Sequence, residues 1–219
     1  MADSVISTVP LPPSLFQFAD IVLSRVLTWA AKNFFAVELA ALLAHIRDLQ
    51  EHPDPENPEA QVNDVQVLTK ALVVAEDRRF YQHAGVDSRG LFRAISVFIR
   101  IRSVQGASTI TQQLVRVLTH DYRRKVARKL KEMCLACAID RKVSKAEQAA
   151  LYLRVGYFGW QMNGLVQASR RLRCRSPLSA AAAAAVVARL RYPEPHNPNA
   201  RQRERIERRA KYIENCMNK

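Results

Sequence analysis

Glycine is scarce in this chain, and so are the features that mark membrane-spanning and secreted proteins. Only 6 of the 219 residues are glycine, which argues against the many turns of an all-β barrel or sandwich. No uncharged apolar run reaches about 18 residues, so we expect no clear membrane span. The N-terminus lacks a basic region ahead of an apolar one, so it does not resemble a secretory signal. With 48% hydrophobic residues the chain is not disordered throughout, and a helical, single-domain protein remains.

Cysteine is also rare, and two of the four cysteines, Cys134 and Cys137, have CxxC spacing. This spacing fits a redox pair or half of a zinc site. No second pair follows at a suitable distance, and the surrounding residues predict a continuous helix. We therefore predict two small apolar residues on a buried helix face rather than a disulfide-stapled scaffold.

Charge is present in excess and is unevenly distributed along the sequence. The 34 Lys and Arg residues outnumber the 20 Asp and Glu residues, which gives a net charge of +14. Residues 1–119 hold 11 basic and 12 acidic side chains, net −1, whereas residues 120–219 hold 23 and 8, net +15. The basic half indicates an anionic partner such as nucleic acid, phosphate or an acidic membrane surface. A merely solubilising basic surface is the alternative.

Prolines divide the chain into an N-terminal segment, 1–60, and a main domain, 61–219. Residues 14–50 are rich in apolar side chains and predict one or two amphipathic helices, which either lie in a membrane interface or pack on the main domain. Pro53, Pro55 and Pro58 stand among acidic residues and indicate a linker.

The main domain shows helical periodicity and no series of alternating strands, so we predict an all-α fold. Thr109 with Gln112, and Ser144 with Glu147, have capping-box spacing. Ser176 and Pro177 provide an N-cap and a first-turn proline for the next segment. Helices are expected at about 65–79, from a cap at Asp87 through Leu91 to Ile99, at about 109–118 and 122–141, after the cap at Ser144, and at 179–190 and 199–217.

Two glutamates stand out as candidates for chemistry. Glu76 follows an apolar helical run, and Glu132 follows Arg128, Lys129 and Lys131. Carboxylates in different environments divide the acid and base roles of sugar chemistry. Helical periodicity alone would make both glutamates ordinary surface residues of helices.

Five segments in order carry a resemblance to a known family: 76–87, 106–114, 128–132, 152–164 and 188–198. They resemble the five motifs of the peptidoglycan glycosyltransferases. These enzymes occur as monofunctional transglycosylases or as the N-terminal domain of class A penicillin-binding proteins. The second segment, which reads GASTITQQL, is similar almost letter for letter.

The resemblance implies a lysozyme-like, two-lobed fold and a defined reaction. An inverting glycosyltransferase would polymerise lipid II into β-1,4-linked glycan strands and release undecaprenyl pyrophosphate. Glu76 would be the general base on the acceptor 4-hydroxyl. Glu132 would lie beside the donor pyrophosphate, with Mg²⁺ or Mn²⁺ as the one candidate cofactor.

The resemblance also implies a set of substrate-binding residues, most of them polar. They are Asp77, Phe80, His83, Gly106, Ser108, Thr109, Gln112, Gln113, Arg116, Arg128 and Lys129. Within this set Arg116 would help to neutralise the pyrophosphate.

The implied partners are lipid II, the growing glycan strand, a membrane surface and other cell-wall synthesis proteins, with no nucleic acid. The implied location is the outer, periplasmic face of the cytoplasmic membrane, where the chain would be peripheral or atypically anchored. Segment 91–101, with Arg93, Arg100 and Arg102 beside apolar residues, would meet the lipid, although a core helix with snorkelling arginines has the same pattern.

Val117 and Arg154 replace asparagines typical of the family, and this favours an alternative function. The chain would then be a weakly active or inactive scaffold that binds lipid II or glycan. A glycan hydrolase on the same scaffold and a basic nucleic-acid-binding protein are further alternatives.

Overall fold

The computed structural model describes residues 13–52, 62–101 and 106–219, and this part of the chain is helical apart from one small hairpin. The helices are α1 (Pro13–Phe34), α2 (Ala36–Glu51), α3 (Val62–Glu76), α4 (Ser88–Ile101), α5 (Ile110–Leu118), α6 (Val126–Asp140), α7 (Lys145–Val155), α8 (Gly164–Arg171), α9 (Ala180–Arg191) and α10 (Ala200–Met217), with a 3₁₀ turn at Phe80–Gln82. The antiparallel strands are β1 (Tyr157–Gly159) and β2 (Met162–Asn163). The predicted all-α class is therefore confirmed.

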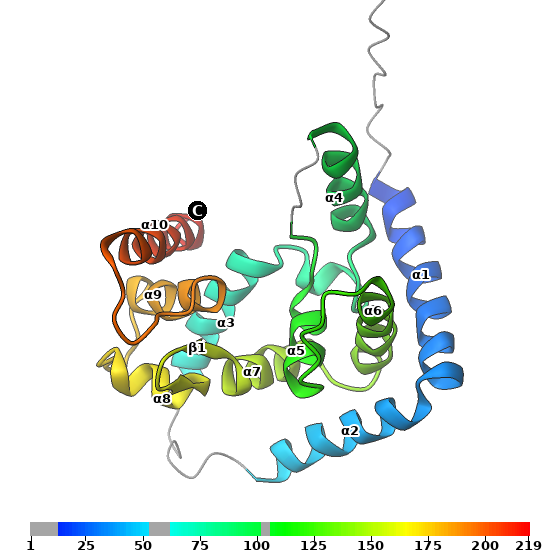
Figure 1. Cartoon of the computed structure of the whole chain (residues 1–219), viewed down its shortest axis with the longest axis horizontal. Helices are drawn as coiled ribbons and strands as arrows, with labels where there is room; N and C mark the ends of the chain where they lie inside the picture. Colours follow the sequence, from blue (N-terminus) through cyan, green and yellow to red (C-terminus); the bar gives the residue numbers. More distant parts are fainter. Residues whose placement is uncertain (1–12, 53–61, 102–105) are drawn as a thin grey trace, which may run out of the picture.

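The core joins two groups of helices. α3 packs against α9 and α10 on one side of the molecule, and α5 packs against α6 and α7 on the other (Figure 1). The apolar faces of α3 and α5 supply Leu72, Ile110 and Leu114, all fully buried. The end of α3 and both ends of α5 are thereby fixed relative to one another, which is what a shared site between them needs.

Capping explains where the helices start. Ser144 and Glu147 form the predicted capping box, and the Thr109 side chain accepts a hydrogen bond from the backbone N–H of Gln112 at the start of α5. The prediction for α9 was wrong: its N-cap is Ser179, whose side chain accepts from Ala182 N–H, and Ser176 lies ahead of the helix.

α6 begins at Val126, later than the predicted residue 122, and its inner face is buried. Cys134 and Cys137 are on that face, and both are free thiols. Burial raises the pKa of the Cys137 thiol to about 12. The prediction that they act as small apolar residues is confirmed.

The N-terminal segment forms two helices that wrap the domain. α1 runs along α6, and α2 continues along the lower edge of the domain in the view of Figure 1. The face of α1 turned toward the domain combines the buried polar residues Asp20, Ser24 and Thr28 with Leu23, Leu27 and Ala31, which pack against the core. Its outward face carries large exposed apolar side chains, namely Leu15, Phe18, Ile21, Val22, Val26, Trp29 and Phe34. Packing on the main domain is thus confirmed, but through the less apolar face.

Two contacts connect α1 to neighbouring helices. Asp20 Oδ1 accepts a hydrogen bond from the backbone N–H of Ser88 at 2.7 Å, at the start of α4. The rings of Phe16 and Phe92 lie 6.1 Å apart. α4 and the first half of α1 therefore lie side by side.

Among the described residues, no single helix is long and apolar enough to cross a membrane, and α1 and α2 meet that condition only as a pair bent by 100°. The predicted linker prolines and Arg102 lie outside the described residues.

Candidate active site

A cleft of about 320 Å³ opens where the end of α3, the start of α4, the loop before α5 and the helix α10 meet. Its polar and charged lining comes from separate parts of the sequence. The lining includes Glu76, Asp77, Arg78, Arg79, Asp87, Arg93, Ser108, Thr109 and Tyr212. Three of the five motif-like segments lie next to it or beneath it, so they converge in space.

Glu76 is the last residue of α3, and its carboxylate is held at both oxygens. Oε2 accepts a hydrogen bond from Gln113 Nε2 at 3.1 Å, and Oε1 lies 3.3 Å from Arg209 Nη2. The Tyr152 hydroxyl donates to Gln113 Oε1 at 2.7 Å, which turns the amide N–H₂ toward Glu76. The carboxylate is thus oriented before any substrate binds.

Glu132 is buried among three cations. Arg116 donates through Nε at 2.9 Å and through Nη2 at 3.1 Å, a bidentate pair, and Arg128 and Lys129 also bond the carboxylate. Burial alone would raise the pKa of Glu132, but the hydrogen bonds from Arg116 and Lys129 and their charges hold it below its usual value. Glu132 is therefore an anion at neutral pH, as its basic neighbours in the sequence predicted.

One face of α5 connects the two carboxylates. Gln113 reaches Glu76, and Arg116, three residues further on, reaches Glu132. Gln112 Oε1 accepts from Lys129 Nζ at 2.6 Å, and Ser108 Oγ accepts from the same amine at 2.9 Å. α5, which begins in the second motif-like segment, is therefore the element that contacts both glutamates.

The remaining candidates from the first motif lie under the cleft rather than on its open surface. Phe80 is fully buried, and His83 Nε2 lies 2.9 Å from Asp77 Oδ2 in a buried pair. Asp77 reaches the cleft wall, but Oδ2 also accepts from the backbone N–H of Ile110. These residues fix the start of α5 relative to α3.

Thr109 has the same supporting position, because its hydroxyl donates to the Gly85 carbonyl at 2.6 Å. Gly85 has φ +85, and a Cβ there would lie 2.7 Å from the carbonyl oxygen of Ala136 on α6. Only glycine permits this approach of the first motif to α6.

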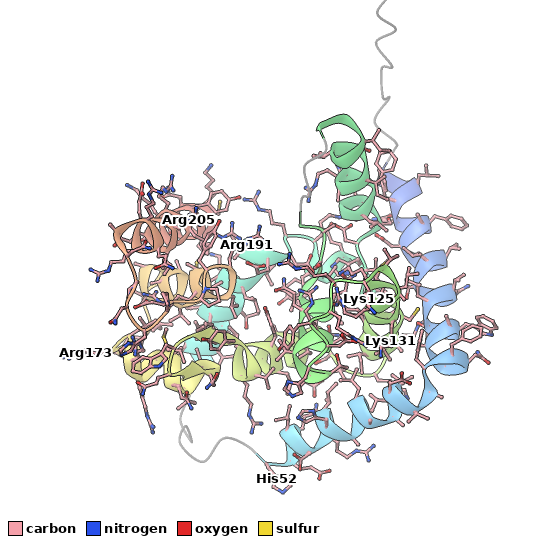
Figure 2. All side chains as sticks on the ribbon, in the orientation of Figure 1. His52, Lys125, Lys131, Arg173, Arg191 and Arg205 are labelled. Atoms are coloured by element: carbon pink, nitrogen blue, oxygen red, sulfur yellow. The ribbon has the colours of Figure 1, made fainter. Side chains whose placement is uncertain are left out.

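One basic side chain of α9 extends toward the loop before α5. A Cβ added to the exposed Gly106 would lie 3.7 Å from Arg191 Nη1, so this guanidinium extends toward the loop before α5. Arg173 and Arg205 lie on the outer side of the molecule, and Lys125 and Lys131 lie at α6 (Figure 2). The positive charge of residues 120–219 is thus partly at the site and partly on the surface.

The donor set at Glu132 does not fit a divalent cation. Both of its oxygens already accept from Arg116, Arg128 and Lys129, and three cations repel a metal ion. Across the described residues no group of three His, Cys, Asp or Glu side chains could hold a metal.

Two residues that bond the catalytic candidate and its partner were not among the predicted site residues, although Tyr152 opens the fourth motif-like segment. Arg209 contacts Glu76, and Tyr152 orients Gln113. Arg209 lies three residues after Ile206 and four before Ile213, both buried, so helical periodicity places it on the inner face of α10. That periodicity was the available signal.

The two departures from the motifs do not reach the carboxylates. Arg154 donates to the backbone carbonyls of Leu49 and His52, at the end of α2. Val117 is partly buried and packs against the core.

Comparison with known proteins agrees with the five motifs. The transglycosylase family model matches residues 46–218. The chain is 43% identical over 104 residues to penicillin-binding protein 1A of Escherichia coli, which covers 47% of this chain and 12% of that protein. It is 35% identical over 116 residues to a monofunctional glycosyltransferase of Staphylococcus epidermidis, and this match covers 53% of this chain and 43% of that protein.

Penicillin-binding protein 1A of Neisseria lactamica is 37% identical over 155 residues, covering 69% of this chain and 19% of that protein. The chain thus spans less than half the length of each of these relatives. Because the family model covers most of the sequence, and the residues it matches build the cleft, the chain belongs to the peptidoglycan transglycosylase family.

Proposed function

We propose that this chain is a peptidoglycan glycosyltransferase that polymerises lipid II into β-1,4-linked glycan strands with inversion at the anomeric carbon. The observation that carries the proposal is the pair of glutamates held by one face of α5 in opposite settings. Glu76 lies at an open cleft beside a neutral amide and one arginine, whereas Glu132 is covered and surrounded by cations. Family membership supports the same reaction.

In the proposed reaction Glu76 takes the proton from the 4-hydroxyl of the acceptor sugar. The electron pair left on that oxygen forms a bond to the anomeric carbon of the donor as the bond from that carbon to the pyrophosphate oxygen breaks. Attack opposite the α-linked leaving group gives the β-linkage in one displacement. The proton remains on Glu76 until it is released to solvent, and undecaprenyl pyrophosphate leaves with the electron pair.

The leaving group needs positive charge, and Arg116, Arg128 and Lys129 supply it. Glu132 neutralises one of the three charges and keeps the cations close together, so the cluster has a net charge of +2. Preorganised cations of this kind stabilise charge that develops in a transition state. No step of the proposed reaction uses a metal ion.

We place the reaction at the outer face of the cytoplasmic membrane, where the chain is a peripheral protein. Phe92, Ile95 and Ile99 of α4 are exposed, and α4 lies beside the apolar outer face of α1. These neighbouring apolar side chains support contact of both helices with lipid. The lipid part of the substrate would approach there, and other cell-wall synthesis proteins are expected partners.

Incubation of the purified chain with labelled lipid II tests the proposal. Wild type should form polymer, and Glu76→Gln should lower the rate by about 10²- to 10⁴-fold because a general base is lost. Glu132→Gln should also be strongly impaired. Glu204→Gln, an exposed carboxylate on α10, is the matched control and should keep full activity. Absence of polymer from wild type, or full activity of either impaired variant, refutes the mechanism.

The second candidate is a scaffold that binds lipid II without polymerising it, which Val117 and Arg154 favour as departures from the family motifs. Retention of labelled lipid II with no change in its length would identify this function. Products shorter than a glycan substrate would instead identify a hydrolase.

A further inference from the structure

Arg209 lies outside the five segments in which the sequence resembles the family motifs, yet it is a cation in contact with Glu76. We propose that Arg209 is a positioning residue that holds the general base ready for the acceptor hydroxyl. This inference rests on the proposed glycosyltransferase function and extends the active site to α10.

The contact is specific in its geometry. Arg209 Nη2 lies 3.3 Å from Glu76 Oε1 and donates to the Ala75 carbonyl, so one nitrogen bridges two consecutive residues at the end of α3. The last carbonyls of a helix lack partners within the helix, and a cation there also favours the helix dipole. α10 thereby caps α3 at its catalytic residue.

The arginine is itself held in place. Its guanidinium carbon lies 5.4 Å from the centre of the Tyr212 ring, one turn along α10. Arg78 approaches the same ring at 5.8 Å and donates to the Tyr212 hydroxyl at 2.6 Å. Arg209 is three-quarters covered, with a side-chain exposure of 24%.

Arg209 and Gln113 divide the two oxygens of Glu76 between them. Gln113 comes from α5 and Arg209 from α10, so the carboxylate is fixed from both walls of the cleft. A carboxylate fixed in this way does not rotate away from the acceptor hydroxyl, and correct orientation is a large share of catalytic rate. The arginine acts through Glu76 and need not touch the substrate.

Activity of the full chain separates this role from a structural one. Arg209→Ala should lower kcat on lipid II by about ten- to a hundredfold while KM stays within about twofold, because orientation is lost and binding is not. Arg209→Lys keeps the charge but lacks the planar fork, and should recover part of kcat. The matched control is Arg208→Ala, an exposed neighbour paired with Glu204, which should match wild type.

A double-mutant cycle tests the contact independently of the reaction. Denaturant unfolding of wild type, Glu76→Ala, Arg209→Ala and the double variant should show that the two single losses are not additive. Additive losses overturn the inference. Polymer from wild type with an unchanged kcat in Arg209→Ala overturns the inference alone, whereas a wild type that makes no polymer overturns the proposed function with it.

Discussion

Glu132 holds together three cations that would otherwise repel one another. Its side chain is 3% exposed, and Arg116, Arg128 and Lys129 approach it from α5 and from its own helix α6. Burial lowers the pKa of Lys129, and the negative charge of Glu132 opposes that effect. The carboxylate is thus a structural necessity for the cluster, whatever it contributes to the leaving group.

This arrangement predicts how stability depends on pH. The native pKa of Glu132 is lowered, so its interactions stabilise the fold at pH values above the unfolded pKa of about 4.3 and are lost as the pH falls through the native pKa. Glu132→Gln has the shape of the protonated side chain, and it should lower the free energy of unfolding by about 3 kcal/mol at pH 7.

Urea unfolding of wild type and Glu132→Gln between pH 7 and pH 3 measures the effect. The gap between the two proteins should narrow steadily as the pH falls below about 4. A gap of constant size over this range would contradict an ionised, cation-bound Glu132.

At the scale of elements, tertiary contacts decide where local signals are ambiguous. Ser176, with Pro177 beside it, was the predicted N-cap of α9. The backbone N–H of Leu178 donates instead to Asp64 Oδ1 on α3, at 2.7 Å, so the chain is fixed ahead of the helix and Ser179 becomes the cap. Leu178 and Asp64 are 114 positions apart in the sequence, so no local sequence pattern could predict this hydrogen bond.

Arg154 gives a prediction about α2. Its guanidinium caps the C-terminal end of α2 by donating to the carbonyls of Leu49 and His52. Arg154 does not line the cleft. Arg154→Ala should therefore lower the free energy of unfolding by about 1 kcal/mol and speed amide hydrogen exchange in the last turn of α2.

The polymerisation rate of Arg154→Ala should stay within about twofold of wild type. Arg154→Asn, which restores the residue typical of the motif, should have the same effect on exchange. A large gain in activity from the asparagine would show that the departure matters at the cleft.

At the scale of the whole molecule, the sequence predicted the features that depend on residues close together in the chain, namely the motifs and the helices. The motifs located Glu76 and Glu132, and apolar periodicity located most helices. Pairs of residues far apart were not predictable in this way: Arg209 bonds Glu76 across 133 positions. Periodicity also shows which face of α1 is apolar, but not which face turns inward.

The inward face of α1 combines Asp20, Ser24 and Thr28 with Leu23, Leu27 and Ala31, whereas the outward face carries most of its large apolar side chains. Asp20 accepts from the start of α4, and Arg141 Nε donates to Thr28 Oγ1 at 3.1 Å, so polar contacts fix α1 on the domain together with the packing of Leu23 and Leu27. Most of the large apolar side chains of α1 therefore face outward. Together with α4 they form an exposed apolar surface on the side of the molecule away from α10 (Figure 1).

We expect this surface to bind lipid bilayers. Replacement of Phe18, Val22 and Trp29 together by Ser should weaken binding to vesicles by about a hundredfold, since burial of these side chains contributes about 3 kcal/mol in total. Vesicle sedimentation measures the change. Gln17→Ser, an exposed polar position on the same helix, should bind as wild type does.

Salt separates the apolar contribution from that of the net charge of +14. Binding of wild type to anionic phospholipid vesicles should weaken as salt screens the basic side chains, but the difference between wild type and the triple variant should persist in high salt and on uncharged vesicles. A triple variant that binds uncharged vesicles as tightly as wild type would mean that the outer face of α1 does not contact lipid, and that the basic surface alone attaches the chain to membranes.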